Sequence, residues 1–308
     1  MAVGARLRHV VESQQFSREL LEEIFSRAHD MRSAPHRASG RLQGRVMAAL
    51  FYEPSTRTRL SFEAAMLRLG GSTMGTDNAR EFSSAAKGET LEDTIRIVSG
   101  YADVIVLRHH EEGAARRAAA ISDVPVISAG DGPGQHPTQA LLDMFTIQDE
   151  LGRLDGISVA FVGDLANGRT VRSLAYLLSK FRDVTVWFVA PPQVAMRQDI
   201  KDHLRERGVR WIEEPDLDRV LPEVDVVYQT RIQKERFPSE AAYDEVKGVY
   251  RIDAAAMARL NPSAIVMHPL PRVDEIAPEV DEDPRSAYFR QARNGLYIRM
   301  ALLDMVLS

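Results

Sequence analysis

Residues 51–63 read Phe-Tyr-Glu-Pro-Ser-Thr-Arg-Thr-Arg-Leu-Ser-Phe-Glu, and this stretch decides the fold of the first part of the chain. The apolar run 46–51 before it is typical of a buried strand. After it, apolar residues at helical spacing extend to Leu69, and Gly70 and Gly71 predict the end of the helix. A strand followed at once by a helix is the repeating unit of α/β proteins.

The turn between this strand and this helix has the features of an anion site. Ser55 is a good N-cap residue, so Thr56, Arg57 and Thr58 fall in the first helical turn. That turn has free backbone N–H groups and the positive end of the helix dipole. A capped helix with solvated arginines is the alternative. Two arginines and three hydroxyl-bearing residues within 55–59 favour a phosphate site instead.

The composition is that of a globular protein with roughly two domains. The 308 residues are 44% hydrophobic and 27% charged, and the net charge of −5 argues against general affinity for nucleic acid. The chain has no cysteine, which excludes disulfides, thiolate metal sites and a cysteine nucleophile. The N-terminus lacks a signal-peptide core, and no apolar run approaches membrane-spanning length. We therefore expect a cytoplasmic protein without a membrane partner.

Strand-like and helix-like segments alternate along the chain, which predicts an α/β fold of two doubly wound domains with parallel sheets. Strands are expected at 46–51, 72–76, 103–107, 124–128, 158–162, 184–189, 209–212, 224–228 and 264–267. A long helix from Pro137 to Leu151 and a C-terminal helix at about 286–306 join the domains. We expect the first domain at 1–137, with 286–308 packing back on it, and the second at 138–285.

Ligands of such sheets bind outside the carboxyl ends of the strands, where this chain carries polar clusters. The clusters are Ser55–Arg59, Arg108–His110, Gly132–Gln139, Gly163–Thr170, Thr230–Gln233 and His268–Arg272. Adjacent histidines rarely face one ion, so we expect no metal at His109 and His110. His136 either caps a helix or has a directed role. Arg169 and Arg231 each follow a buried strand, which favours contact with a ligand over simple exposure to solvent.

The cluster at 163–170 also reads G-x-x-x-x-G-R-T, one substitution from a nucleotide-binding P-loop. The P-loop requires lysine where Arg169 stands, and arginine does not replace it conservatively. No convincing Mg²⁺-binding strand follows. Nucleotide hydrolysis is therefore a minor hypothesis.

Taken together, these clusters resemble the transcarbamylase family, and within it the catalytic chains specific for aspartate. The similarity extends from about Gly44 to near the end of the chain. The ornithine-specific members carry His-Cys-Leu-Pro at 268–271, where this chain has His-Pro-Leu-Pro. The matching segments are Ser55–Arg59, Lys87–Thr90, Arg108–His109, Gly130–Gly132, His136–Gln139, Gly168–Thr170, Arg231–Arg236 and His268–Glu275.

The resemblance implies transfer of the carbamoyl group of carbamoyl phosphate to L-aspartate, in pyrimidine biosynthesis. It implies no metal or organic cofactor, a homotrimer with shared active sites, and the option of regulatory chains or a larger assembly. It assigns carbamoyl phosphate to Ser55, Thr56, Arg57, Thr58, Arg108, His136 and Gln139. It assigns aspartate to Lys87, Arg169, Arg231, Gln233 and Leu270.

The resemblance also implies how these residues act. Thr58, Arg108 and His136 polarise the carbonyl oxygen as charge develops, with His136 as a neutral or a protonated donor. The Leu270 carbonyl holds the incoming amine. No side chain is an obvious general base, and the departing phosphate can accept the amine proton. By resemblance, Ser83 and Lys87 act in the active site of the neighbouring subunit. The sequence of that segment alone would instead predict a flexible surface loop.

Some features leave alternatives open. Some relatives have a second lysine where this chain has Ala86, and a Lys-Tyr pair where it has Ala166 and Asn167. These departures bear on regulation. Glu53 and Arg236 match positions linked to domain closure, but can equally be surface charges.

A transcarbamylase for another amine is one alternative function, which the segments 231–236 and 268–272 argue against. A non-catalytic paralogue is another, disfavoured because it would have lost one of Arg57, Lys87, Arg108, His136, Arg169 or Arg231.

Overall fold

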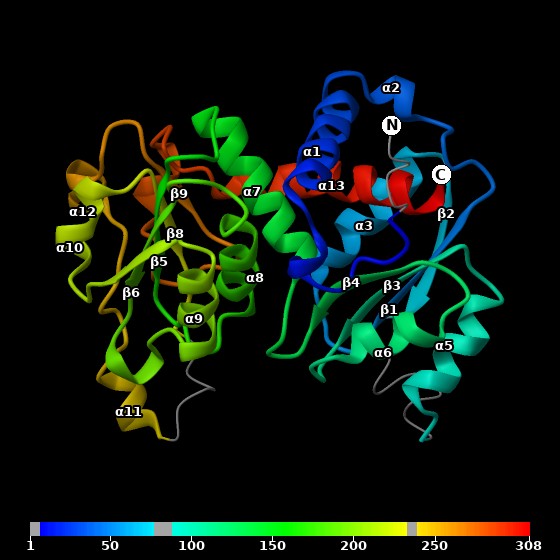
Figure 1. Ribbon diagram of the computed structural model, residues 1–308, viewed down its shortest axis with the longest axis horizontal. Coiled ribbons are helices and arrows are strands. Elements are labelled where there is room, and N and C mark those ends of the chain that lie inside the picture. Colours follow the sequence, from blue (N-terminus) through cyan, green and yellow to red (C-terminus); the bar gives the residue numbers. More distant parts are fainter. Residues whose placement is uncertain (1–6, 77–87, 233–238) are drawn as a thin grey trace. The chain divides into compact units, whose positions relative to one another are not determined.

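The structure is a computed structural model that describes residues 7–76, 88–232 and 239–308. The chain forms two compact units (Figure 1). Unit 1 comprises Met1–Leu141 with Asn294–Ser308, and unit 2 comprises Leu142–Arg293. The chain passes from one unit to the other within helices α7 (Pro137–Leu151) and α13 (Tyr288–Leu307). Each unit has a parallel sheet with helices, so the predicted architecture is confirmed.

Unit 1 is built on a four-stranded parallel sheet in the order β2-β1-β3-β4. These strands are β1 (Val46–Phe51), β2 (Ser72–Thr76), β3 (Val104–His109) and β4 (Val126–Asp131). β1, β3 and β4 are almost wholly buried, whereas β2 at the edge is largely accessible. Continuous apolar runs such as 46–51 fit this placement, because helices cover both faces of a parallel sheet.

The helices of unit 1 lie on both faces of this sheet. They are α1 (Arg18–Ser33), α2 (Pro35–Ala38), α3 (Thr56–Arg68), α5 (Leu91–Ser99) and α6 (Ala114–Ile121), with a 3₁₀ turn at Ser13–Gln15. Figure 1 shows α5 and α6 on one face and α1 and α3 on the other. Leu91 and Ile95 of α5 pack with Ala114 and Ala118 of α6 against the strands. The Thr90 hydroxyl caps α5 by accepting from Asp93 N–H, as expected of that residue type.

Unit 2 has a five-stranded parallel sheet in the order β7-β6-β5-β8-β9. Its strands are β5 (Ser158–Val162), β6 (Thr185–Val189), β7 (Arg210–Glu213), β8 (Val226–Gln229) and β9 (Ile265–Met267). Its helices are α8 (Arg169–Leu178), α9 (Gln198–Glu206), α10 (Leu217–Val220), α11 (Glu240–Asp244) and α12 (Ala254–Arg259). Its described residues also form 3₁₀ turns at Pro192–Val194, Leu221–Glu223 and Pro278–Glu282. Figure 1 shows α8 and α9 on one face and α10 and α12 on the other.

Each sheet has one point where the strand order reverses. In unit 1 the chain moves outward from β1 to β2 and then returns to the other side of β1 with β3. In unit 2 it moves from β5 through β6 to β7 and returns to the other side of β5 with β8. Crevices for ligands form where the carboxyl ends of such strand pairs diverge. The turns that follow β1, β3, β5 and β8 are therefore the ones to search for a site.

The predicted strands are confirmed with small shifts at their ends. The largest is in β4, predicted at 124–128 and observed at Val126–Asp131. β3 is also longer than predicted, because Arg108 and His109, which we expected in a loop, belong to the strand. β3 continues past its apolar run because β4 also continues, and His109 pairs with Asp131 across the two strands. Apolar residues alone mark the buried middle of a strand, so polar residues at its carboxyl end escape detection.

Candidate active site

The turn between β1 and α3 in unit 1 leaves the first N–H groups of the helix without a side-chain cap. Ser55 is the N-cap residue of α3, as predicted, and its backbone is extended. Its hydroxyl, however, accepts no hydrogen bond from the helix. The first-turn N–H groups of Thr56, Arg57 and Thr58 are thus not satisfied by the cap side chain. Such a turn can bind an anion through its N–H groups and the helix dipole.

The two arginines of this turn differ in their partners. Arg59 donates from Nε to Glu63 Oε1 at 2.7 Å, one helical turn further along α3. Arg57 makes no ion pair with any of the residues that the structure describes. Partial burial of its guanidinium lowers the pKa of Arg57. An anion near Arg57 would offset that loss of hydration, so Arg57 is the arginine of this turn that fits a phosphate.

Arg108 lies on β3, beside the end of β1, and points its guanidinium across the strand ends. It donates to the Ala129 carbonyl at 3.1 Å and lies 3.5 Å from Glu53 Oε2. Phe51 is its register partner on β1, and Tyr52 N–H donates to the Arg108 carbonyl at 2.8 Å. Arg108 and the turn after β1 therefore share the reversal point of this sheet.

The loop after β4 is bonded to the end of β3. Gly132 N–H donates to the His109 carbonyl at 2.8 Å. A Cβ at Gly132 would lie only 2.3 Å from the His110 carbonyl oxygen, and its φ is +50°, so glycine is needed here. The buried Asp131 carboxylate accepts from Gly113 N–H at 2.9 Å and Gln135 N–H at 3.2 Å. These contacts hold the loop at the carboxyl edge of the sheet.

His136 follows this loop and directly precedes α7. Its carbonyl accepts from the N–H groups of Gln139 and Ala140, at 3.0 and 3.2 Å, so its backbone caps the helix. Its side chain does something else: it is buried, and its Nδ1 lies 3.4 Å from the Thr138 hydroxyl. Helix capping therefore accounts for the backbone of His136 but not for the burial of its imidazole at this edge of the sheet.

His109 and His110 are stacked on one another and do not converge on a shared point. Their ring centroids are 4.3 Å apart, and His109 also contacts the Tyr52 ring. His109 Nδ1 accepts from Glu111 N–H at 3.1 Å. Burial, followed by the neighbouring His110, lowers the pKa of His109 to about 4. Among residues 7–76, 88–232 and 239–308, no three His, Asp or Glu side chains gather as a metal site.

In the turn between β5 and α8 of unit 2, three loop N–H groups that precede the helix are already bonded. Leu165 and Ala166 both donate their N–H to the Val194 carbonyl at 3.0 Å. Asn167 donates its N–H to the buried Asp164 carboxylate at 3.1 Å. A P-loop needs these N–H groups for phosphate, and the Asp164 carboxylate would repel it. The geometry contradicts the P-loop interpretation of 163–170.

Arg169 and Arg231 lie on turns that contact each other at the reversal point of the second sheet. Arg169 is the first residue of α8, and Arg231 lies two residues beyond β8. Thr230 donates both its N–H and its hydroxyl to the Val162 carbonyl at 2.8 Å, which ties the end of β8 to the end of β5. A Cβ at Gly163 would lie 2.5 Å from the Thr230 carbonyl oxygen, so the two turns touch.

Leu270 lies three residues beyond β9, on the carboxyl edge of the same sheet. Its φ of +53° is in the left-handed region, which is uncommon for a leucine. His268 and Glu275 form a buried pair within this loop at 2.8 Å. We quoted Glu275 only as part of a motif and did not single out Asp131, Asp164 or this pair. Their signal in the sequence is faint: Asp131 and Asp164 are single acidic residues next to glycine near strand ends, and Glu275 is one of two adjacent acidic residues in a loop.

The remaining predicted residues, Ser83, Lys87, Gln233 and Arg236, lie outside the described residues. The others fall into two sets, each on one sheet's carboxyl edge. Those of unit 1 are Glu53, Ser55, Thr56, Arg57, Thr58, Arg108, His136 and Gln139. Those of unit 2 are Arg169, Arg231 and Leu270.

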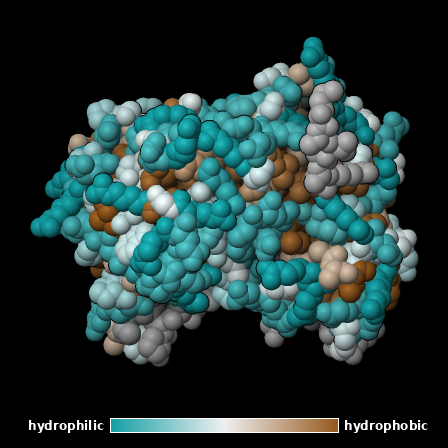
Figure 2. All heavy atoms as spheres, viewed as in Figure 1, coloured by the Kyte–Doolittle hydropathy of each residue, from teal (hydrophilic) through white to brown (hydrophobic). Residues whose placement is uncertain are grey.

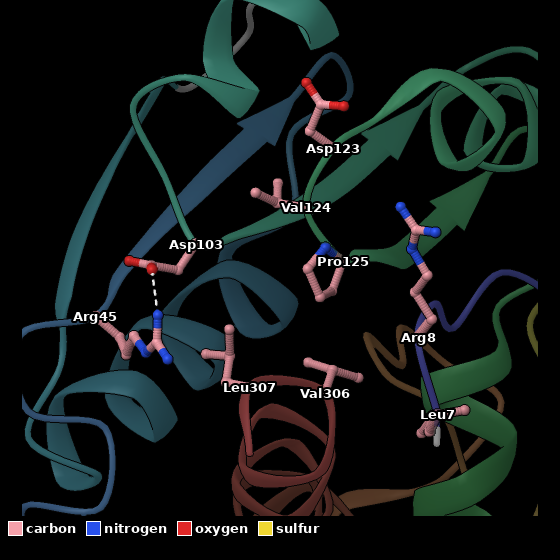
Figure 3. Close-up of a pocket in the computed structure, with 9 residues that line it drawn as sticks. All are labelled: Leu7, Arg8, Arg45, Asp103, Asp123, Val124, Pro125, Val306 and Leu307. Atoms are coloured by element: carbon pink, nitrogen blue, oxygen red, sulfur yellow. Dashed lines mark hydrogen bonds and ion pairs between the residues drawn. The ribbon is translucent and has the colours of Figure 1, made fainter. Parts of the chain in front are cut away.

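A pocket of about 480 Å³ lies at the other edge of the first sheet (Figure 3). Arg45, Asp103 and Pro125 lie just before β1, β3 and β4, so the pocket is at the amino ends of these strands. The figure shows Arg45 paired with Asp103, and the atoms are 2.7 Å apart. The lining residues are Leu7, Arg8, Arg45, Asp103, Asp123, Val124, Pro125, Val306 and Leu307. The pocket is separate from the site at the carboxyl ends.

The surface is mostly polar on the side that Figure 2 shows, where hydrophobic residues appear in small separate areas. In the part of the chain that the structure describes, no helix has the length and apolar character needed to cross a membrane.

Comparison with known families gives a match over nearly the whole chain. Residues 8–149 match the family described as aspartate/ornithine carbamoyltransferase, carbamoyl-P binding domain. Residues 155–306 match the family described as aspartate/ornithine carbamoyltransferase, Asp/Orn binding domain.

Individual relatives are similar over their length. The chloroplastic aspartate carbamoyltransferase of Oryza sativa is 60% identical, over 100% of this chain and 87% of the relative. The catalytic subunit of aspartate transcarbamoylase from M. jannaschii is 48% identical, with a TM-score of 0.91 over 97% of this chain and 98% of that one. The Trypanosoma cruzi enzyme in complex with N-(phosphonacetyl)-L-aspartic acid is 44% identical, with a TM-score of 0.92 over 98% and 97%.

Proposed function

The chain belongs to the aspartate/ornithine carbamoyltransferase family, and on that premise we propose the residues through which it acts on carbamoyl phosphate and L-aspartate. It is a carbamoyltransferase that forms N-carbamoyl-L-aspartate and phosphate. The observation that carries the assignment of the phosphate site is the first turn of α3. Its N–H groups receive no bond from Ser55, and Arg57 has no carboxylate partner among the described residues. Unit 1 is the proposed carbamoyl-phosphate domain, and unit 2 the aspartate domain.

The phosphate of carbamoyl phosphate binds, in this proposal, to the first turn of α3. Ser55, Thr56 and Thr58 offer hydroxyls and N–H groups, and Arg57 supplies the charge. Gln139, in the first turn of α7, holds the carbamoyl nitrogen. The proposal is supported by the location of both turns at the carboxyl edge of one sheet.

Thr58, Arg108 and His136 polarise the carbonyl oxygen of carbamoyl phosphate. Negative charge develops on this oxygen when the amine attacks, and donors already in place stabilise it without reorganisation. Arg108 suits this role because its Ala129 and Glu53 contacts fix its guanidinium at the reversal point. His136 suits it because its side chain is buried and its backbone is fixed by α7.

Aspartate binds on unit 2 through its two carboxylates. Arg169 and Arg231 can each contact one carboxylate with a planar pair of N–H donors. The contact between their two turns supports this pairing. Gln233 and Lys87 assist, in this proposal, and the Leu270 carbonyl accepts from the amine.

The reaction then balances without a side-chain base. The amine nitrogen of aspartate attacks the carbonyl carbon, the carbon–oxygen bond to phosphate breaks, and phosphate leaves with the electron pair. The departing phosphate accepts the amine proton. The protein contributes position and charge stabilisation, and we propose that domain closure brings both sets of residues to the substrates.

We propose that the active chain is a homotrimer, with Ser83 and Lys87 acting in the neighbouring subunit's site. The exposed apolar residues of α3 support an interface there: Leu60 and Leu67 lie seven residues apart on one helical face and are 57% and 59% exposed. β2, at the sheet edge beside α3, leads into the segment that contains Lys87. We also propose a cytoplasmic location and the option of binding regulatory chains.

A transcarbamylase for another amine and a non-catalytic paralogue are the alternatives to be tested. The test supplies carbamoyl phosphate with L-aspartate or, as the matched amine, L-ornithine, and measures the carbamoylated product and the mass of the assembly on one sample. Carbamoyl aspartate from a trimer is the expected result. Product from ornithine alone, or none from either amine in a folded trimer, would reject the assignment.

A further inference from the structure

The loop after β9 is organised around the buried pair of His268 and Glu275. His268 is 2% exposed, and its Nε2 lies 2.8 Å from Glu275 Oε1. His268 N–H donates to Gln291 Oε1 of α13 at 2.9 Å, which fixes the backbone at the end of β9. The pair is therefore built into unit 2 and is not a surface contact.

The hydrogen bonds of His268 determine which ring nitrogen carries its proton. Leu270 N–H lies 2.7 Å from His268 Nδ1. A backbone N–H can only donate, so Nδ1 is the acceptor and carries no proton. The proton of the neutral ring is then on Nε2, from which it is donated to Glu275. The imidazole thus connects the Glu275 carboxylate to the backbone of Leu270.

Glu275 holds the other end of the same loop. Its Oε2 accepts from Val273 N–H at 3.0 Å and from Asp274 N–H at 3.1 Å. Burial by itself would raise the pKa of Glu275, but the hydrogen bonds from His268 and the backbone outweigh it and lower this pKa. The carboxylate is thus suited to remain charged and to orient the imidazole. One carboxylate fixes the loop on both sides of Leu270.

Leu270 is the residue of this loop that most needs such support. Its φ of +53° places its Cβ close to the following carbonyl oxygen, so the conformation persists only where the surroundings enforce it. Its N–H bond to His268 Nδ1 supplies that constraint directly. Loss of the bond would free the Leu270 peptide to turn, and with it the direction of the Leu270 carbonyl.

We propose that His268 and Glu275 are positioning residues for the attacking amine, because Glu275 holds the proton on His268 Nε2 so that Nδ1 fixes the Leu270 peptide. This inference rests on the proposed function, in which the Leu270 carbonyl receives the amine of aspartate. Neither side chain contacts the substrate in this account. Their effect is confined to the amine and does not extend to the carboxylates, which Arg169 and Arg231 bind.

Two substitutions of His268 separate its two ring nitrogens. In His268→Asn the amide oxygen stands where Nδ1 was and can still accept from Leu270 N–H. In His268→Gln the amide nitrogen stands where Nε2 was and can still donate to Glu275, but Leu270 N–H loses its acceptor. Each variant gives up one buried hydrogen bond, so similar thermal stability is expected. Tyr250→Phe, which removes a bond to the Pro215 carbonyl elsewhere in unit 2, controls for general loosening.

The test measures kcat and KM for aspartate, and inhibition by succinate, which has both carboxylates but no amine. We expect His268→Gln to lose roughly tenfold or more in kcat/KM for aspartate, with succinate inhibition unchanged, because only the amine contact is disturbed. His268→Asn and Tyr250→Phe should remain within about threefold of the unmodified chain.

Equal losses in the Asn and Gln variants, or parallel losses for aspartate and succinate, would overturn the positioning role while leaving the proposed function intact. An unmodified chain that forms no carbamoyl aspartate would overturn both. A Gln variant that keeps full activity with aspartate would also overturn the positioning role.

Discussion

The turn after β1 in unit 1 and the turn after β5 in unit 2 are built alike but leave different groups available. Both connect a buried strand to a helix at a reversal point, and both place arginine in the first helical turn, Arg57 in one and Arg169 in the other. After β1 the cap hydroxyl of Ser55 leaves the N–H groups unbonded. Gly168, the N-cap residue of α8, also offers no side-chain cap, but the N–H groups of the loop before it, Leu165 to Asn167, are bonded to Asp164 and the Val194 carbonyl.

The N–H groups that remain unbonded at a strand-to-helix turn select the anion that it can bind. Free N–H groups and an unpaired arginine suit a phosphate, which has several acceptor oxygens to satisfy. A turn whose loop N–H groups are already bonded has fewer donors for a phosphate, and the planar guanidinium of its arginine suits a carboxylate. The two turns therefore support different substrates, in keeping with the two roles proposed for the units.

Replacing Arg57 by alanine should cause the largest loss. Without its charge-assisted contact to phosphate, transition-state stabilisation should fall on the order of 2–4 kcal/mol, or roughly 30- to 900-fold in kcat/KM. Arg59→Ala is the matched control, because Arg59 is already paired with Glu63 and should matter far less. Steady-state kinetics gives kcat/KM for both folded variants. Equal losses in the two variants would contradict the assignment of phosphate binding to Arg57 and not Arg59.

Mixing two inactive variants should restore part of the activity. Lys87→Ala and His136→Ala trimers should each be nearly inactive, because each lacks one component of every site. Denaturing and renaturing an equal mixture should rebuild roughly a quarter of the sites if each site draws on two chains of a closed ring. Activity at the mutant baseline, with hybrid trimers confirmed by mass, would show that Lys87 does not act in the neighbouring subunit.

The buried histidines at the strand ends extend the comparison. His268 Nε2 lies against the Glu275 carboxylate, whereas His109 Nδ1 accepts from the backbone N–H of Glu111. The pKa of His109 is lowered from 6.5 to about 4. Between these values the unfolded chain binds a proton that the folded chain does not, so the free energy of unfolding falls as pH falls from 6.5 towards 4. The loss should be on the order of 2–3 kcal/mol.

His109→Asn retains an acceptor for Glu111 N–H but cannot titrate. Denaturant unfolding of both proteins at several pH values isolates the histidine, because Asp131 and the other acids titrate in each. A difference between the two proteins that does not change over this pH range would show that His109 is protonated in the folded chain.

The smallest expected effect is that of ATP. Because the N–H groups of Leu165 to Asn167 after β5 are bonded within the protein, ATP with Mg²⁺ should neither be hydrolysed nor change the rate of carbamoyl transfer. Product analysis after long incubation is sufficient. Hydrolysis of ATP that is lost on Arg169→Ala would restore the P-loop interpretation.

The fold could be predicted almost completely from the sequence. Buried strands of a parallel sheet are continuous apolar runs, and Gly70, Pro137 and Gly152 mark where helices begin or end. Strand order could not be predicted, because parallel strands are joined by long crossovers whose side of the sheet no local pattern fixes. For the same reason the sequence predicted the turns after β1 and β3 as two separate motifs, and did not predict that these turns lie next to each other in the structure.

The candidate site could be predicted only in part. The Arg, His and Thr side chains were found because their chemistry is visible in a short motif. The residues that hold the loops of the site in place were not predicted. Asp164 and Glu275 act through hydrogen bonds to backbone N–H groups, and nearly any acidic residue in a loop can make such bonds. Ser55 is a further example: serine at an N-cap predicted a hydrogen bond from the first turn of α3 to its hydroxyl, and the structure shows no such bond.

We propose that unit 1 binds carbamoyl phosphate and unit 2 binds aspartate, and measuring the binding of each ligand separately tests this assignment most directly. Calorimetry with carbamoyl phosphate alone, and then with succinate at saturating carbamoyl phosphate, avoids turnover because succinate has no amine. We predict that Arg57→Ala weakens the binding of carbamoyl phosphate by at least tenfold, whereas Arg231→Ala leaves it unchanged and weakens succinate by a similar factor. Equal losses of both ligands in both variants would contradict the assignment of phosphate to unit 1 and of the dicarboxylate to unit 2.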